Sequence, residues 1–192
     1  LENDSRKAQW TFQGSHSKDQ FDVTADWIID GSGPRSWLLH QENVKDCTEQ
    51  LQTRTSSVYS HWFECPKTEE WLREQGTTVA DFPFPIDQAA VHHLFADGWL
   101  WKIRFANSRI SLGFVRNLDA SPEPFQLSGT DAWNSMLCQH PVLQRILSGI
   151  RLADFPGKIF RTERLQRLMA VGAGERWCAL PFTVGFIDQL HS

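Results

Sequence analysis

The chain has 192 residues, of which 41% are hydrophobic and 22% charged, and its formal net charge is −4. This is the composition of an ordinary globular protein, and the length allows one large domain or two small ones. No stripe of lysine and arginine marks a nucleic-acid surface, so nucleic acid is not an expected partner. The sequence contains no run of about 18 apolar residues, so no membrane span is expected.

The chain has four cysteines: Cys47, Cys65, Cys138 and Cys178. They are widely spaced and form no C-x-x-C pair, which is typical of reduced thiols in a cytosolic protein rather than of a disulfide scaffold or a zinc site. His92 and His93 could ligate a metal, but adjacent residues on a strand point to opposite faces. We therefore expect a cytoplasmic protein without a metal site.

The first part of the chain alternates in the manner of β-strands. Residues 10–12 and 21–27 predict a hairpin around a polar turn at 14–19. The apolar run Trp27-Ile28-Ile29 then predicts a strand that is buried on both faces.

A glycine-containing turn, Asp30-Gly31-Ser32-Gly33, follows this strand. In open α/β sheets ligands bind beyond the carboxyl ends of the strands, where glycines let the backbone approach a phosphate or a ring. The same four residues also make a plain turn. The G-x-G-x-x-G spacing is not met, because Ser36 stands at the last glycine position.

The stretch from His92 to Val115 organises the middle of the chain. It alternates strictly: Trp99, Trp101, Ile103 and Phe105 point one way, and Leu100, Lys102 and Arg104 point the other. A period of two predicts a strand, and turns at 96–98 and 107–108 predict an antiparallel meander of three strands with one bulky aromatic face. A helix layer, a second sheet or a bound ligand must cover that face. The nine Trp and 13 Phe residues fit either a bulky core or a wall for a flat aromatic ligand.

A strand and a short helix are expected before the meander. Residues 56–63 predict the strand, and residues 68–75 predict the helix, which Thr68 caps and Gly76 ends.

Beyond the meander, Thr130 or Asp131 can cap a helix, and Pro141 marks the first turn of another. Several arginines follow: Arg151, Arg161, Arg164 and Arg167. They make either a solvated surface or, in one case, a contact with a ligand anion. Residues 177–180 predict one more buried strand.

Three separated stretches, in this order, resemble one family. Residues 26–33, D-W-I-I-D-G-S-G, look like the strand and D-A-S-G turn of FAD-dependent monooxygenases. Residues 92–115 resemble the H-H-x-F-x-D-G-W-x-W-x-I-P segment of flavin-dependent halogenases, the tryptophan halogenase-like group. Residues 177–192, which end in G-F-I-D-Q-L-H-S, resemble the motif G-D-A-A-G-F-x-D-P-L-x-S of the same superfamily.

The resemblance implies an FAD-dependent oxidoreductase of which this chain is an internal fragment. In the family, reduced flavin meets oxygen to form a hydroperoxide, which a halogenase turns into hypohalous acid and a monooxygenase transfers directly. The family's nucleotide fingerprint and catalytic lysine would lie upstream, so no catalytic residue is assigned. The implied partners are an aromatic or other organic substrate and a separate flavin reductase.

The resemblance also implies site residues and a domain plan. Asp30, Gly31 and Gly33 would lie by the FAD, Gly185 and Asp188 would approach the isoalloxazine and pyrophosphate, and Trp99 and Trp101 would lie between the flavin and the substrate chamber. The implied fold class is α+β (α/β), with an antiparallel substrate-domain sheet, flanking helices and parts of a Rossmann-like FAD-binding domain. Residues 1–40 would belong to the FAD-binding domain, 41–170 to the substrate domain and 171–192 to the returning FAD-binding segment.

Three positions depart from the family pattern. Arg104 stands where halogenases have proline, Pro181-Phe182 replaces a Gly-Asp whose aspartate binds the flavin ribityl chain, and Gln189 replaces a proline. Halogenation, hydroxylation and reduction therefore all stay open. The alternative from another class is a non-catalytic domain that binds an aromatic or lipid ligand on the tryptophan-rich sheet.

Overall fold

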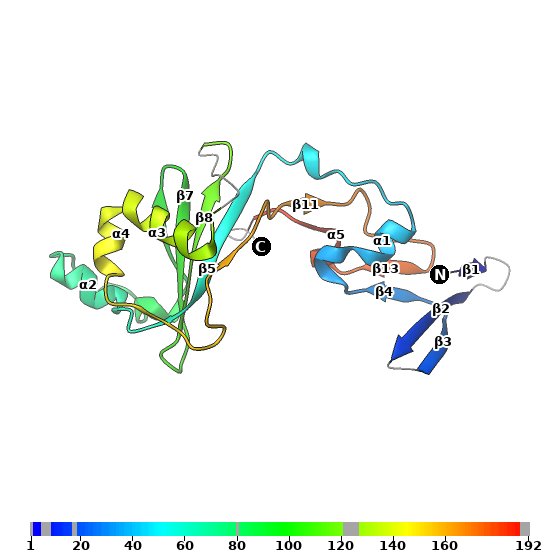
Figure 1. The fold of residues 1–192 in the computed structure, drawn as a ribbon, viewed down its shortest axis with the longest axis horizontal. Helices are drawn as coiled ribbons and strands as arrows, with labels where there is room; N and C mark the ends of the chain where they lie inside the picture. The colour runs from blue at the N-terminus through cyan, green and yellow to red at the C-terminus, as the bar shows by residue number, and fades with distance from the viewer. Residues whose placement is uncertain (1, 5–8, 17–18, 80, 121–126, 189–192) are drawn as a thin grey trace. The chain divides into compact units, whose positions relative to one another are not determined.

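The computed structural model describes residues 2–4, 9–16, 19–79, 81–120 and 127–188. The chain forms two compact units (Figure 1): unit 1 contains Leu1–Thr53 and Gln166–Ser192, and unit 2 contains Arg54–Leu165. Both contain helices and antiparallel strands, so the expected α+β class is confirmed. The assignment of an FAD-binding and a substrate domain stays a prediction.

Unit 2 is built on a six-stranded antiparallel sheet. Its strands, in sheet order, are β10 (Phe160–Arg161), β5 (Thr55–Phe63), β8 (Ile110–Asn117), β7 (Gly98–Arg104) and β6 (Val91–Phe95), while β9 (Arg151–Leu152) pairs with β5. Strands β6, β7 and β8 are the expected meander, which is confirmed. The register places Trp101 opposite Gly113, and Gly113 opposite Tyr59.

Helices cover one face of this sheet. α3 (Gly129–Gln139) and α4 (Pro141–Ile146) lie against it, and α2 (Thr68–Glu74) and the 3-10 turn η3 (Ile86–Gln88) complete the unit. The core residues from the sheet are Val58, Trp62, Leu100, Ile110, Leu112 and Phe114, and those from the helices are Ala132, Trp133, Met136, Leu143 and Leu147. Trp133 stacks on Trp62 with ring centroids 4.8 Å apart. Leu100 lies on this face, so the helices cover the face opposite Trp99 and Trp101.

The ends of the helices correct two expectations. Thr68 is the first residue of α2 rather than its cap, because Lys67 occupies the N-cap position. Ser128, and not Thr130 or Asp131, caps α3, since its side chain accepts a hydrogen bond from the backbone N–H of Asp131. Local sequence did not separate Ser128 from Thr130 and Asp131, because each has a side chain that can cap a helix, and it did not mark Lys67, whose side chain makes no cap hydrogen bond.

Other local expectations hold. Gly76 follows α2 with a φ of +77°, a left-handed conformation that glycine adopts without steric cost. Pro141 is in the first turn of α4, where a backbone N–H would have no acceptor within the helix, so the missing N–H of proline costs no hydrogen bond.

Unit 1 contains the expected N-terminal hairpin and a small parallel arrangement. Strands β1 (Glu2–Asp4), β2 (Gln9–His16) and β3 (Asp19–Ala25) form an antiparallel sheet, and β12 (Ala173–Gly174), β13 (Trp177–Ala179) and β4 (Ile28–Asp30) form another, in which β13 and β4 are parallel. The remaining elements are η1 (Gly33–Arg35), α1 (Trp37–Gln41), η2 (Thr48–Gln50), β11 (Arg167–Leu168), α5 (Pro181–Val184) and β14 (Gly185–Phe186). Trp10, Leu38, Leu39, Met169 and Trp177 form its buried core.

The expectation that 27–29 is buried on both faces is wrong. Ile28 packs against the core of unit 1, but the side chains of Trp27 and Ile29 are 62% and 67% exposed. Successive side chains of a strand point to opposite faces, and the core of the described chain lies on only one of them. Among the described residues, no helix is both long and apolar enough to cross a membrane.

Candidate functional site

Two loops that are distant in sequence leave the parallel strands at the same edge. Ile28 to Asp30 run alongside Trp177 to Ala179 in parallel, with Asp30 opposite Ala179. The segments that follow, 31–36 and 180–188, therefore begin together at the carboxyl ends of β4 and β13. This edge is where open α/β sheets bind their ligands.

Asp30 shapes the first of these loops. Its buried carboxylate accepts a hydrogen bond from the backbone N–H of Ser32 at 2.7 Å and another from that of Leu38 at 2.8 Å. The Asp30 carbonyl accepts the N–H of Leu180 at 2.9 Å, which ties the two loops together. Asp30 thus binds the protein's own backbone, and any contribution to a ligand site comes through the shape of the loop.

Thr183 is the second tie between the loops. Its hydroxyl accepts the backbone N–H of Gly33 at 3.1 Å, and its carbonyl accepts the Ser36 hydroxyl at 2.7 Å. Gly33 has a φ of +63°, which favours glycine at this turn. Sequence reasoning missed Thr183, because nothing near it in sequence marks a partner about 150 residues away.

A groove lies beside the second loop. It has a volume of about 650 Å³ and is lined by Leu168, Ala179, Pro181, Phe182, Val184, Gly185, Phe186, Ile187 and Asp188. The rings of Phe182 and Phe186 meet edge to face, with centroids 5.7 Å apart. Its size and largely apolar lining are those of pockets that bind small organic molecules and cofactors.

Arg167 supports the wall of this groove. It lies on β11 opposite Phe186 of β14, and its guanidinium carbon is 4.4 Å from the centroid of the Phe182 ring. One guanidinium N–H donates to the Phe182 carbonyl. Phe182 is nevertheless 52% exposed, so the arginine holds the ring without covering it.

The five expected residues fall on two adjoining loops, Asp30, Gly31 and Gly33 on the first and Gly185 and Asp188 on the second. Gly185 and Asp188 line the groove, while a Cβ on Gly31 would lie 3.4 Å from the Leu180 side chain. A Cβ on Gly185 would lie 3.0 Å from the Arg167 carbonyl oxygen, so a side chain there would press on β11. Gln189 and the rest of the last motif lie outside the described residues.

Trp99 and Trp101 lie in unit 2, on the sheet face opposite the helices. Trp99 is buried and its ring is 6.3 Å from that of His92. Trp101 is half-buried, and its indole N–H donates to the Ser111 hydroxyl at 3.0 Å. The Trp101 ring crosses β8 over Gly113, where a Cβ would lie 2.3 Å from the ring.

An aromatic row extends from Trp101, and sequence reasoning did not anticipate it. The Tyr59 ring is 5.9 Å from Trp101, and Phe160 stacks on Tyr59 at 5.4 Å with an interplanar angle of 22°. The cross-strand register of β7, β8, β5 and β10 places these residues in line. Alternation marks one face of each strand, but it does not show which strands lie side by side.

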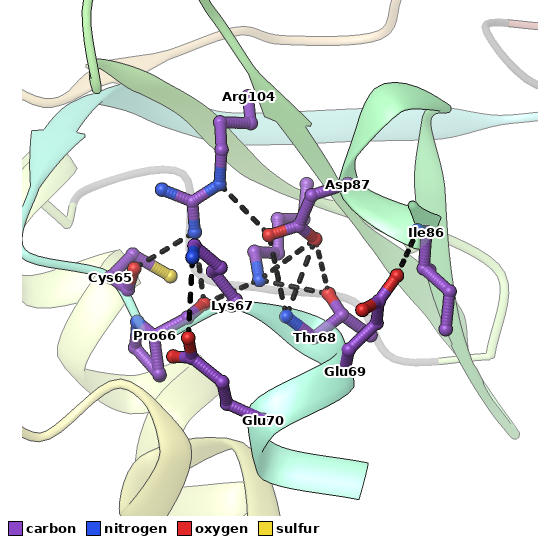
Figure 2. A network of polar contacts seen from close by, with 10 residues as sticks. Cys65, Pro66, Lys67, Thr68, Glu69, Glu70, Ile86, Asp87 and Arg104 are labelled. Atoms are coloured by element: carbon purple, nitrogen blue, oxygen red, sulfur yellow. Dashed lines mark hydrogen bonds and ion pairs between the residues drawn. The ribbon is translucent and has the colours of Figure 1, made fainter. Parts of the chain in front are cut away.

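The opposite, helix-covered face holds a buried ionic network (Figure 2). Lys102 donates to the Pro66 carbonyl at 2.7 Å and to the Thr68 hydroxyl at 2.9 Å, and its Nζ is 3.3 Å from Asp87. Arg104 donates to the other Asp87 oxygen at 2.8 Å and to the carbonyls of Cys65 and Pro66. Arg104, which departs from the family proline, is therefore a structural residue that fixes η3 and the start of α2 to the sheet.

The network also shifts the ionisation of its members. Burial opposes the charge of Asp87, but the hydrogen bond from Thr68 and the charges of Lys102 and Arg104 outweigh it, so the pKa of Asp87 lies below its ordinary value. Burial lowers the pKa of Lys102 against the attraction of Cys65 and Asp87. Each donor of the Lys102 ammonium has a protein acceptor, so the network has a structural role rather than an open binding site.

Comparison with solved structures shows which proteins this chain is similar to. The halogenase PltM in complex with phloroglucinol and FAD matches 100% of this chain and 37% of its own, with a TM-score of 0.81 and 26% identity. CmlS, a flavin-dependent halogenase, matches 97% of this chain and 30% of its own with a TM-score of 0.73 and 18% identity, which shows the fold alone. The chain is thus similar to a segment of each of these halogenases.

Curated relatives agree with this assignment. The tetracycline 7-halogenase of Kitasatospora aureofaciens is 29% identical over 178 residues, which are 88% of this chain and 31% of that protein. The monodechloroaminopyrrolnitrin halogenase PrnC of Pseudomonas fluorescens is 24% identical over 176 residues, which are 88% of this chain and 29% of that protein. The chain thus spans about a third of the length of these relatives. No model of a known protein family matches it.

Proposed function

We propose that the complete protein is an FAD-dependent halogenase and that this chain supplies part of its flavin site and part of its substrate chamber. The observation that carries the proposal is the groove beside the joined carboxyl ends of β4 and β13. The groove lies in a chain that matches the FAD-bound halogenase PltM over 100% of the chain's own length.

The residues of the groove fit a flavin. A flat apolar ring system can pack against Phe182 and Phe186, and the volume of about 650 Å³ is ample for it. Gly185 and Asp188 would approach the ring and the pyrophosphate, while Asp30, Gly31 and Gly33 would shape the adjoining loop. Bound FAD would supply the electron transfer that activates oxygen; the protein residues bind it, orient it and exclude water.

The substrate side is assigned to unit 2. Trp101, Tyr59 and Phe160 form a row of aromatic rings on the face that the helices leave uncovered, and the buried Trp99 lies on the same face. PltM has been crystallised with phloroglucinol, a small flat phenol. A small aromatic molecule is therefore the proposed substrate class, with halogenation ahead of direct oxygen transfer because both curated relatives are halogenases.

The first experiment is an absorption spectrum of the complete protein after addition of FAD and gel filtration. We expect a retained flavin spectrum. After addition of a phenol such as phloroglucinol together with chloride, oxygen, NADH and a separate flavin reductase, we expect the chlorinated phenol, detectable by mass spectrometry. A retained flavin with only hydroxylated product would favour a monooxygenase. No retained flavin would contradict the enzyme assignment and favour a domain that binds ligands on its aromatic sheet.

The role of Trp101 has its own test. Trp101→Ala in the complete protein should raise the KM for a phenol substrate about fivefold, since a stacked aromatic contact contributes about 1 kcal/mol. The affinity for FAD should not change. Ile103→Ala, on the same face but 38% exposed, is the control. An unchanged KM in Trp101→Ala would show that Trp101 does not contact the substrate.

A further inference from the structure

We propose that Arg167 is a positioning residue of the flavin site, which holds Phe182 as the aromatic wall against which the flavin ring packs. This inference rests on the proposed FAD site. It adds two residues, Arg167 and Phe182, that the motif resemblance does not assign, and position 182 is one where this chain departs from the family pattern.

The geometry joins the arginine to the ring in two ways. The guanidinium lies over the face of Phe182, 4.4 Å from its centroid, and it donates to the carbonyl of the same residue. The first contact orients the ring and the second fixes its backbone. The edge of Phe186 supplies a further contact, so Phe182 is held by neighbours on β11 and β14.

The exposure of Phe182 points to a ligand. A phenylalanine that is 52% exposed, lines a groove and is fixed by a cation offers apolar surface at a defined orientation. A flat ring that covers such a surface gains binding free energy without first having to order the side chain.

The test compares variants of the complete protein by FAD titration, with flavin fluorescence and the visible absorption spectrum as readouts. Arg167→Gln and Phe182→Leu should each weaken FAD binding about tenfold and shift the flavin absorption bands, because the fixed aromatic wall is lost. Arg167→Lys should lose less, since it keeps the charge over the ring. The double variant Arg167→Gln/Phe182→Leu should bind about as weakly as either single variant, because both act through one ring.

A matched control lies in unit 2. The Arg151 guanidinium carbon is 5.1 Å from the centroid of Phe63, so Arg151→Gln removes a similar contact away from the groove and should leave FAD binding and spectrum unchanged. Unchanged affinity and spectrum in Arg167→Gln and Phe182→Leu would overturn the inference. If Arg167→Gln does not fold, as judged by circular dichroism, Phe182→Leu and Arg167→Lys decide it. Failure of the unmodified protein to bind FAD would instead overturn the proposed function.

Discussion

The chain holds charged groups in two contrasting settings. In unit 2, Lys102, Asp87 and Arg104 satisfy one another and nearby carbonyls on the helix-covered face of the sheet. In unit 1, Arg167 packs on an exposed aromatic ring beside an open groove. The denser polar cluster is thus the structural one, and the sparser one is the candidate site. The two settings differ in whether the charged groups bond one another inside the protein or lie beside an open groove.

The largest effect is expected from the buried network. Asp87→Asn leaves Lys102 and Arg104 without a counter-charge and should lower the free energy of unfolding of this chain by about 3–5 kcal/mol. Urea denaturation measures it. The control is Asp119→Asn, whose pair with Arg54 is about half exposed and should contribute less than about 1 kcal/mol. Equal effects in the two variants would refute the contrast between buried and exposed pairs.

The same carboxylate predicts a dependence of stability on pH. The folded pKa of Asp87 lies below its unfolded value of about 3.9, so its stabilisation is complete above that pH. It is lost as the pH falls through the folded pKa. Thermal unfolding is measured between about pH 6 and pH 3, a range that includes the unfolded pKa. The unfolding temperature of the unmodified chain should fall more steeply with decreasing pH than that of Asp87→Asn. Parallel curves would show that Asp87 does not carry the effect.

A smaller effect is expected where the aromatic row crosses β8. Gly113→Val would place a Cβ 2.3 Å from the Trp101 ring and 2.6 Å from the Tyr59 Cβ. The rings must shift, which should lower the free energy of unfolding by about 1–3 kcal/mol. Tryptophan fluorescence during denaturation measures this free energy. An unchanged free energy of unfolding in Gly113→Val would mean that the aromatic row is loosely packed.

The smallest effect concerns the first loop of unit 1. Gly33→Ala introduces a side chain at a φ of +63°, which should cost about 1–2 kcal/mol in stability. The Cβ itself finds room, since its nearest neighbour would be a Phe182 ring atom at 3.6 Å. Gly149→Ala is the control, because no atom lies within 4 Å of the added Cβ. Loss of FAD affinity in Gly33→Ala alone would link this loop to the groove.

The sequence predicted what local patterns determine. Alternation through Trp99 and Lys102 gave the meander, and Pro141 marked the start of α4, because both depend on neighbours in sequence. It did not show which face of β7 the helices cover, since Leu100 and Trp99 are both bulky and apolar. Burial of a face depends on what packs there, which a strand's own residues do not specify.

The candidate site was predictable only in part. The turn at 30–33 was marked by its own glycines and aspartate, whereas Gly185 and Asp188 were named only through the resemblance to the family motif, and their contact with FAD stays a prediction. The sequence did not single out Thr183 or Phe182, nor Arg167 among the four arginines at 151–167, because the contacts of these residues are made across the fold. Phe182 in particular replaces the residue that the family pattern expects, so a motif comparison passes over it.

The most direct measurement for the central claim is a structure of the complete protein with FAD bound. We expect the flavin ring in the groove, in contact with Phe182 and with the backbone between Gly185 and Asp188, and the network of Lys102, Asp87 and Arg104 unchanged. A flavin bound elsewhere, with the groove empty or filled by the protein's own side chains, would contradict it.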